Sequence, residues 1–130
     1  MNTVVMQLPY KTVIEMSVLE SPVEIYDCKV WVVFGPIVKT LEAYFKDEEG
    51  NVAGLTRDLL EDLGVILVTF EHPPGISTAV HELYHTMDFI CKNRGIEPSG
   101  NNEAQAYLLD YLVDNFYKRY NVEDPQQSLP

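Results

Sequence analysis

The sequence is poor in the residues on which several classes of protein depend. Its 130 residues include nine Lys or Arg against twenty Asp or Glu, which leaves a formal net charge of −11. This charge repels phosphate backbones and no basic cluster offsets it, so we expect no nucleic-acid partner. Two cysteines are too few for a disulfide framework in a chain of this size.

Long apolar runs are also missing. The first eleven residues lack the basic segment and apolar stretch of a signal peptide, and no later run is long enough for a transmembrane helix. We therefore expect a cytoplasmic protein with no membrane partner. The oligomeric state stays open, because no feature of the sequence bears on it.

What remains is the composition of an ordinary globular domain. Hydrophobic residues make up 46% of the chain and charged residues 22%, and we find neither a repeat nor a low-complexity segment. We expect one domain over residues 1–120 and a frayed C-terminal tail over residues 121–130.

The first half of the chain predicts strands and one helix. Partial alternation of apolar and polar residues indicates a strand over 12–19, which Pro22 should end, and a second short strand over 23–26. The apolar run 30–34 predicts a strand that is buried on both faces. Apolar residues at helical spacing predict a helix over 37–47.

The segment 55–63 is ambiguous. Its leucines fit an amphipathic helix by their period, and they fit equally well a strand that folds back near Gly64. The following run, 65–70, is rich in β-branched and aromatic residues and predicts a strand.

Two helices are expected in the second half. Ser77 or Thr78 could cap a helix that runs to about Asn93, with Gly95 just beyond its end. A last helix should run from Glu103 to about residue 120 and bury the side that carries Ala106, Leu108, Leu109, Leu112, Val113 and Phe116.

The segment His81-Glu82-Leu83-Tyr84-His85 lies inside the first of these helices and holds two of the three histidines. Residues four apart on a helix lie one turn above each other on the same face. His81 and His85 could therefore bind one metal ion together. Glu82 lies beside the same face, where its carboxylate could reach a metal-bound water without becoming a ligand. This is the HExxH arrangement of zinc hydrolases; a solvated helix face with two histidines is the plainer alternative.

A catalytic zinc needs a third protein ligand and keeps one position for water. Glu103 is the strongest candidate, because it lies 18 residues after His85 near the start of the next helix, across a turn that would let the helices face each other. His72, beyond a Pro-Pro-Gly loop, is a second candidate, although an exposed loop histidine is the simpler interpretation.

The segment 81–85 followed by Asn102-Glu103-Ala104 resembles the gluzincin group of metallopeptidases, and also the small single-domain HExxH proteins of bacteria and their phages. The resemblance covers residues 77–116. It implies an α+β fold: a small zincin-like domain in which an N-terminal, mostly antiparallel sheet with a helix precedes the HExxH helix and a C-terminal helix that carries the third ligand. It also implies Zn²⁺ as the cofactor.

The chain departs from the gluzincin pattern at two points. That pattern commonly has an aspartate four residues after the third ligand, where this chain has Tyr107. Asp88 or Asp110 could replace it by accepting the ring N–H of a ligand histidine. Tyr107 itself could stabilise an oxyanion, since it lies one turn from Glu103. The chain is also too short for the separate helical lobe of larger relatives.

These residues predict a zinc metallopeptidase that acts on a peptide or protein. Zinc would activate a bound water, Glu82 would take the proton of that water, and the strand 65–70 could offer an edge to an extended substrate. The alternative is an inactive, zinc-stabilised binding or regulatory module with a peptidase-like fold. A third alternative is an acidic interaction domain without metal. Cys91 falls on the apolar side of its helix and is expected to be a small buried thiol.

Overall fold

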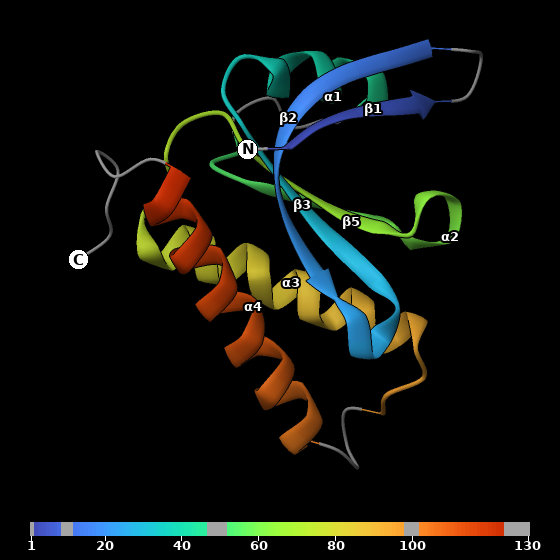
Figure 1. Cartoon of the computed structure of the whole chain (residues 1–130), viewed down its shortest axis with the longest axis vertical. Coiled ribbons are helices and arrows are strands. Elements are labelled where there is room, and N and C mark those ends of the chain that lie inside the picture. The colour runs from blue at the N-terminus through green and yellow to red at the C-terminus, as the bar shows by residue number, and fades with distance from the viewer. Residues whose placement is uncertain (1, 9–11, 47–51, 98–101, 124–130) are drawn as a thin grey trace.

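A computed structural model describes residues 2–8, 12–46, 52–97 and 102–123. Its elements, in chain order, are β1 (Asn2–Leu8), β2 (Thr12–Val23), the 3-10 turn η2 (Glu24–Tyr26), β3 (Cys28–Phe34), α1 (Ile37–Phe45), β4 (Leu55–Leu59), α2 (Leu60–Leu63), β5 (Val65–Phe70), α3 (Ile76–Asn93) and α4 (Asn102–Glu123). The fold is α+β, with strands first and the two long helices last (Figure 1).

The five strands form one mixed, mostly antiparallel sheet in the order β1-β2-β3-β5-β4. Among the described strands, only β3 and β5 run parallel to each other, and the chain passes through α1, β4 and α2 between them. The mostly antiparallel N-terminal sheet expected from the sequence is thus confirmed.

The N-terminal strands are longer than expected. β1 was not predicted, and β2 continues through Pro22, which pairs with Lys29 of β3. β1 pairs with residues 12–18 of β2, and Pro22 lies beyond this pairing. At Pro22, the edge of β2 that faces away from β3 is therefore not paired with β1. A proline, which lacks an N–H donor, is tolerated at such an edge. The expected strand at 23–26 was wrong, since this segment is largely the turn η2.

The ambiguous segment 55–63 is a strand followed by one helical turn. β4 pairs antiparallel with β5, α2 makes the reversal, and Gly64 ends it with a φ of 70°. β4 is therefore one edge strand of the sheet, and β1 is the other. The expectation that residues 65–70 offer a free edge was wrong, because β5 lies between β3 and β4, and all six of its residues are buried.

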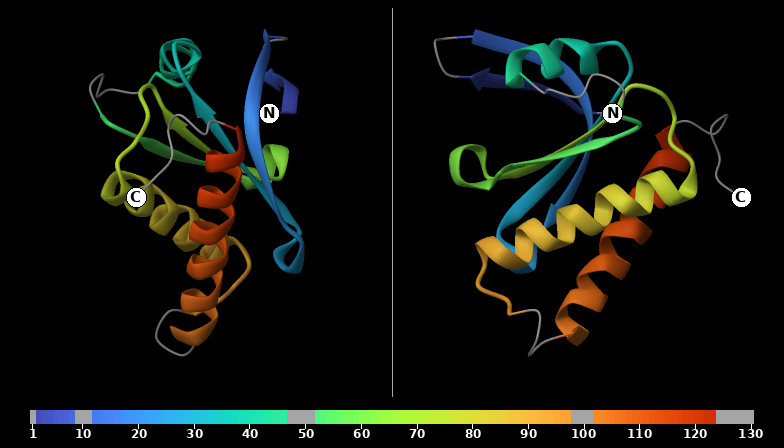
Figure 2. Two further views of the ribbon diagram at one scale, coloured as in Figure 1. Left: turned by 60° about the vertical axis from the view of Figure 1, so that its left-hand side comes forward. Right: turned by 180° about the vertical axis from the view of Figure 1, so that it is seen from behind.

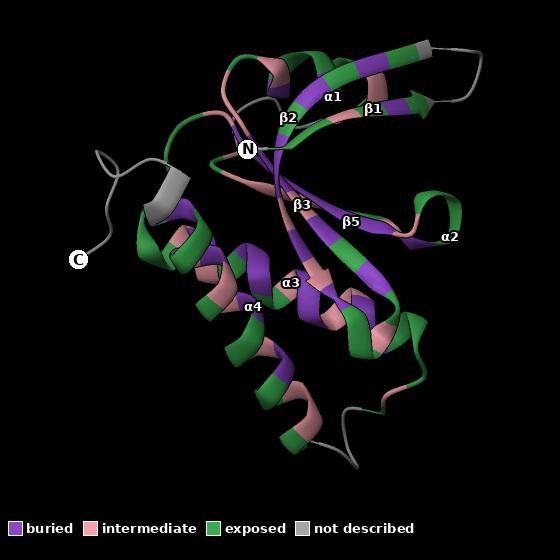
Figure 3. Ribbon diagram, in the orientation of Figure 1, coloured by how far each residue is buried: buried purple, intermediate pink, exposed green. Residues whose placement is uncertain are grey.

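The helices cover both faces of the sheet. α1 packs on one face in a core that includes Met6, Val18, Val33, Leu41 and Leu67. α3 and α4 pack on the other face in a larger core that includes Val30, Val68, Leu83, Ile90, Leu112 and Phe116 (Figures 1 and 3). Alternate residues of the central strands contribute to opposite cores, which accounts for their continuous apolar sequence.

The bounds of α3 are close to those expected, but its cap is not. The residue at the N-cap is Gly75, without a side-chain hydrogen bond, so neither Ser77 nor Thr78 caps the helix. Gly95 follows with a φ of 72°, as its place beyond the helix predicts.

The last helix reaches further than expected. α4 continues to Glu123, into the predicted tail, and the rest of that tail lies outside the described residues. Leu108, Leu112 and Phe116 are buried as expected, whereas Ala106 is exposed. In the described parts of the chain, no helix is both long and apolar enough to cross a membrane.

Candidate metal centre

His81 and His85 lie together on α3, as their spacing predicts. Their Nε2 atoms are 3.2 Å apart, and the ring planes are nearly perpendicular, at 82°. The side chain of His81 is 67% exposed, so the pair is open to a solvent-borne ion.

The separation of these nitrogens suits a shared zinc ion. Zn–N bonds of 2.0–2.1 Å at a tetrahedral angle place two ligand nitrogens about 3.3–3.4 Å apart. The observed separation of 3.2 Å is close to this value. The two imidazoles could therefore occupy two neighbouring corners of a tetrahedral site.

Glu82 lies beside the pair but is not exposed with it. The residue is only 6% exposed, because strand β4 covers this flank of α3. From behind, α3 can be followed along this edge of the sheet (Figure 2, right). The Thr56 hydroxyl lies 2.8 Å from Glu82 Oε1, while Oε2 lies 3.9 Å from His81 Nε2. Glu82 is therefore buried beside the exposed face that carries the two histidines. Its carboxylate is nevertheless adjacent to the histidines.

Gly54 closes the other side of this carboxylate. A Cβ added at position 54 would lie 2.7 Å from Phe70 Cε1 and 3.0 Å from Glu82 Cγ. Both contacts are too short for a side chain at this position. Gly54 and Thr56 were missed in the sequence. Alternation along residues 54–58 would have placed them on one face of a strand, but the helical interpretation of 55–63 competed with it.

A shallow hollow opens at this point. Its volume is about 280 Å³, and it is lined by Ala53, Gly54, Ser77, Thr78, His81 and Glu82. A second hollow of about 320 Å³ shares Ala53 and Thr78 with it and extends to Glu71 and His72. His81 and Glu82 thus line the first of two neighbouring hollows, which have Ala53 and Thr78 in common.

Glu103, the expected third ligand, is exposed at the start of α4. Among the described residues, no group of three or more His, Cys, Asp or Glu side chains lies close enough to hold a metal ion. The hydroxyl of Tyr117 meets the carbonyl oxygen of Ile76, so the later turns of α4 lie beside the first turn of α3. Glu103 is about four turns earlier on α4, which explains why it is not grouped with the histidines.

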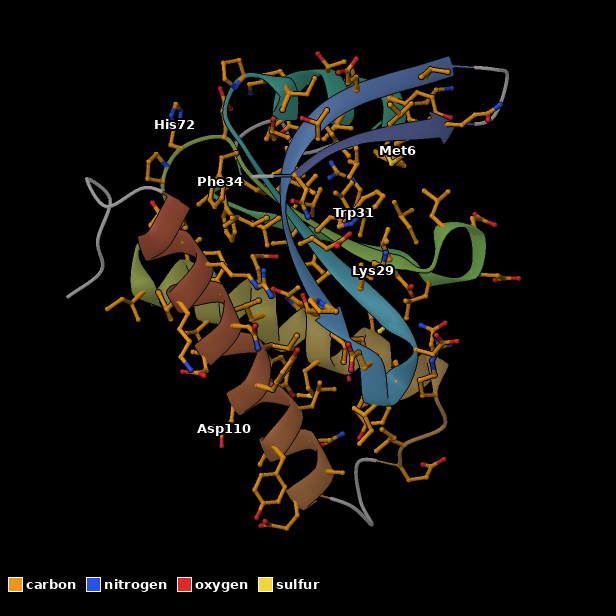
Figure 4. The ribbon with its side chains drawn as sticks, viewed as in Figure 1. Met6, Lys29, Trp31, Phe34, His72 and Asp110 are labelled. Atoms are coloured by element: carbon orange, nitrogen blue, oxygen red, sulfur yellow. The ribbon has the colours of Figure 1, made fainter. Side chains whose placement is uncertain are left out.

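His72 is also not grouped with the pair. It is an exposed residue on the loop between β5 and α3, with Nε2 3.9 Å from Oε1 of Glu71 (Figure 4). This matches the simpler interpretation of a loop histidine.

The two aspartates proposed to support a ligand histidine lie in different surroundings. Asp88 pairs with Lys92 one turn further along α3, at 2.8 Å, and this hydrogen bond raises the pKa of Lys92. Asp110 is exposed and points outward from α4 (Figure 4).

Tyr107 lies in a different part of the surface from the histidine pair. It is 69% exposed and lines a groove of about 540 Å³ between η2 and the start of α4, together with Ile25, Tyr26 and Tyr111. The Tyr111 hydroxyl donates to the carbonyl oxygen of Pro22 in the same region.

Cys91 is a buried thiol in the larger core, as expected from its place on α3. Burial raises the pKa of Cys91 and of Cys28, which is also buried and free. Neither thiol is therefore poised as a thiolate ligand or nucleophile.

Comparisons with protein families, with curated proteins and with solved structures give no match to this chain.

Proposed function

We propose that this chain is a zincin-like, zinc-dependent metallopeptidase in which Glu82 acts as the general base. The observation that carries the proposal is the local geometry of α3: two Nε2 atoms 3.2 Å apart with a carboxylate oxygen 3.9 Å from one of them. The contact between the two Nε2 atoms also has the length of a hydrogen bond, but a solvated helix face would not require a buried glutamate beside the rings.

His81 and His85 would hold the zinc ion through Nε2, and Glu103 is proposed as the third protein ligand. When bound, zinc lowers the pKa of a coordinated water towards about 7 and polarises the carbonyl of a substrate. The role of Glu103 requires its carboxylate to come closer to the histidines than it lies in this structure. Asp88, Asp110 and Tyr107 remain proposals as supporting residues.

Glu82 carries the proton transfers. Its Oε2 faces the histidine side, so it can accept a proton from the attacking water and then donate it to the leaving amine. Its position between Gly54 and Thr56 keeps the carboxylate off the surface and reduces competition from bulk water.

The substrate would be an extended peptide or protein segment. β4 is the edge strand beside α3, and an edge strand offers main-chain donors and acceptors to an added strand. The hollow that contains His81 and Glu82 adjoins residues 53–54, directly before β4. A substrate aligned with β4 would therefore pass the proposed metal.

Replacing Glu82 with Ala or Gln tests the assigned role. We expect each purified variant to retain close to one zinc per chain, because Glu82 is not a ligand. Cleavage of a library of quenched fluorescent peptides should fall by at least about 100-fold, since general-base catalysis contributes on the order of 10²–10⁴. Zinc content is measured by elemental analysis and cleavage by fluorescence.

Glu61→Ala on the exposed turn α2 is the matched control and should leave both quantities unchanged. A wild-type chain that binds zinc but cleaves none of the peptides would contradict the peptidase proposal. Full cleavage by the Glu82 variants would contradict the general-base role.

The alternative function is a zinc-stabilised binding or regulatory module without turnover. A structural zinc takes four protein ligands, and among the described residues no group of three or more His, Cys, Asp or Glu side chains lies close enough to hold a metal ion. In a module of this kind, removal of zinc should loosen α3 and α4, and Glu82 should be replaceable without loss of partner binding. The retention of a glutamate next to the pair argues for the peptidase, because a purely structural site needs no general base.

A further inference from the structure

We propose that Thr56 is the positioning residue of Glu82. Its hydroxyl fixes the plane of the carboxylate so that Oε2 stays turned toward His81. The inference rests on the proposed role of Glu82 as general base, and it assigns a function to a strand residue outside the HExxH helix.

The contact that carries the inference joins two elements. Thr56 belongs to β4 and Glu82 to α3, and the threonine hydroxyl oxygen lies 2.8 Å from Oε1 of the carboxylate. The same oxygen lies 3.1 Å from the main-chain carbonyl oxygen of Glu82. A hydroxyl has a single proton to donate, and a carboxylate is the stronger acceptor, so the shorter contact takes the proton.

Without this bond the carboxylate would be free to turn. Gly54 lies close to the inner part of this side chain, since a Cβ added at position 54 would come within 3.0 Å of Glu82 Cγ. The last torsion of a glutamate joins an sp³ to an sp² carbon and has only broad minima, so packing of Cγ does not fix it. The hydrogen bond from Thr56 to Oε1 does, and it leaves Oε2 on the side of His81.

A purely structural role for Thr56, in which it only holds β4 against α3, predicts other effects of substitution than the positioning role does. Thr86 provides the comparison, because its buried hydroxyl donates to the main-chain carbonyl oxygen of Glu82, at 3.0 Å. Of the two threonines, only Thr56 has a contact with the carboxylate among the hydrogen bonds of the described residues. Variants of the two residues therefore separate the positioning role from general support of the helix.

The experiment compares Thr56→Val, Thr56→Ala and Thr56→Ser with Thr86→Val, all in the full chain loaded with zinc. We expect Thr56→Val and Thr56→Ala to lower kcat for the fluorescent peptide library by about 10- to 100-fold, with KM within about twofold, because a misplaced catalytic group costs rate more than binding. Thr56→Ser keeps the hydroxyl and should restore kcat to within about threefold. Thr86→Val should keep wild-type kinetics. Zinc content should stay the same in all four variants.

Crystal structures of the same variants give a readout that does not depend on activity. In Thr56→Val and Thr56→Ala the carboxylate of Glu82 should turn away from the position it has in the wild type, and in Thr56→Ser it should keep that position. If the wild-type chain cleaves no peptide, the proposed function fails while the crystal structures still decide the role of Thr56. An unmoved carboxylate in Thr56→Ala, or equal kinetic losses in Thr86→Val and Thr56→Val, would overturn the inference.

Discussion

Gly54, directly before β4, lies against the side chains of Phe70 and Glu82. A methyl group at this position would come within 2.7 Å of the Phe70 ring and 3.0 Å of Glu82 Cγ, so the strand or the glutamate would have to move. Overpacking of this kind costs about 1–3 kcal/mol. We expect Gly54→Ala to lower the free energy of unfolding by this amount, measured by urea denaturation, and to lower peptide cleavage by displacing Glu82.

Gly75→Ala is the matched control for this prediction. Gly75 has a φ of −72°, which suits any residue, and an added Cβ would meet no atom within 4 Å. Its free energy of unfolding should fall by no more than about 1 kcal/mol, because Gly75 is the N-cap of α3 and Ala is a poorer N-cap residue than Gly, and its peptide cleavage should match that of the wild type. Equal stability of Gly54→Ala and wild type would show that the contacts around Glu82 relax without cost.

The sequence identified the residues of the candidate centre that share one helix. His81, Glu82 and His85 follow from helical periodicity alone, because the pitch of α3 fixes their relative directions. Gly54 and Thr56 act on Glu82 across 26 or more residues of chain, through packing of β4 against α3. Periodicity within one element does not encode such a contact, and the burial of Glu82 was missed for the same reason.

At the scale of elements, the proposed third ligand, Glu103 on α4, leads to a prediction about zinc affinity. If Glu103 completes the zinc site, Glu103→Gln should weaken zinc binding by at least about 10-fold, because the site would lose one of three protein ligands. The dissociation constant is measured by competition with a chromophoric chelator. This result would also show that the start of α4 approaches α3 more closely than in this structure.

Glu97→Gln is the matched control, since Glu97 is an exposed acid that precedes α4 and has no proposed contact with the metal. It should bind zinc as tightly as the wild type. If Glu103→Gln also binds zinc with unchanged affinity, Glu103 is not a ligand, and the site consists of His81, His85 and a donor other than this residue.

The elements themselves were predictable to different degrees. The buried run of β5 and the amphipathic pattern of α3 gave the type and approximate bounds of each. The position of β5 inside the sheet was not predictable, because its pairing with β3 and β4 depends on where the rest of the chain crosses over. The predicted end of the strand at Pro22 was wrong for a related reason. A proline ends a strand only where a neighbouring strand would have needed its N–H, and the position of that neighbour is not encoded locally.

At the scale of the molecule, the sequence predicted the α+β class and the order of strands before helices. These features follow from composition and period, which are summed over many residues. The distance between Glu103 and the histidines was not predictable in the same way, because it depends on how α3 and α4 pass each other. The contact of Tyr117 with Ile76 marks that arrangement, and the sequence carries no local signal for it.

The packing of α3 and α4 also decides what removal of metal should do. Both helices join the sheet through a continuous apolar core that includes Leu83, Met87, Ile90, Leu112 and Phe116, and neither proposed histidine ligand belongs to it. We therefore expect excess chelator to leave the far-UV circular dichroism spectrum unchanged. The free energy of unfolding should fall only by the binding contribution, about 2.7 kcal/mol when free zinc is at 100 times its dissociation constant, and the melting temperature should fall with it.

His81→Ala is the control, because its melting temperature should not respond to zinc or to chelator. A structural zinc would behave differently: its binding free energy would be folding free energy, and chelation would unfold the chain. Loss of the helical signal on chelation would therefore favour the zinc-stabilised module over the peptidase. An apo-protein that keeps its fold and regains cleavage when zinc is returned would favour the peptidase, since the core holds the helices in place while the metal serves the reaction.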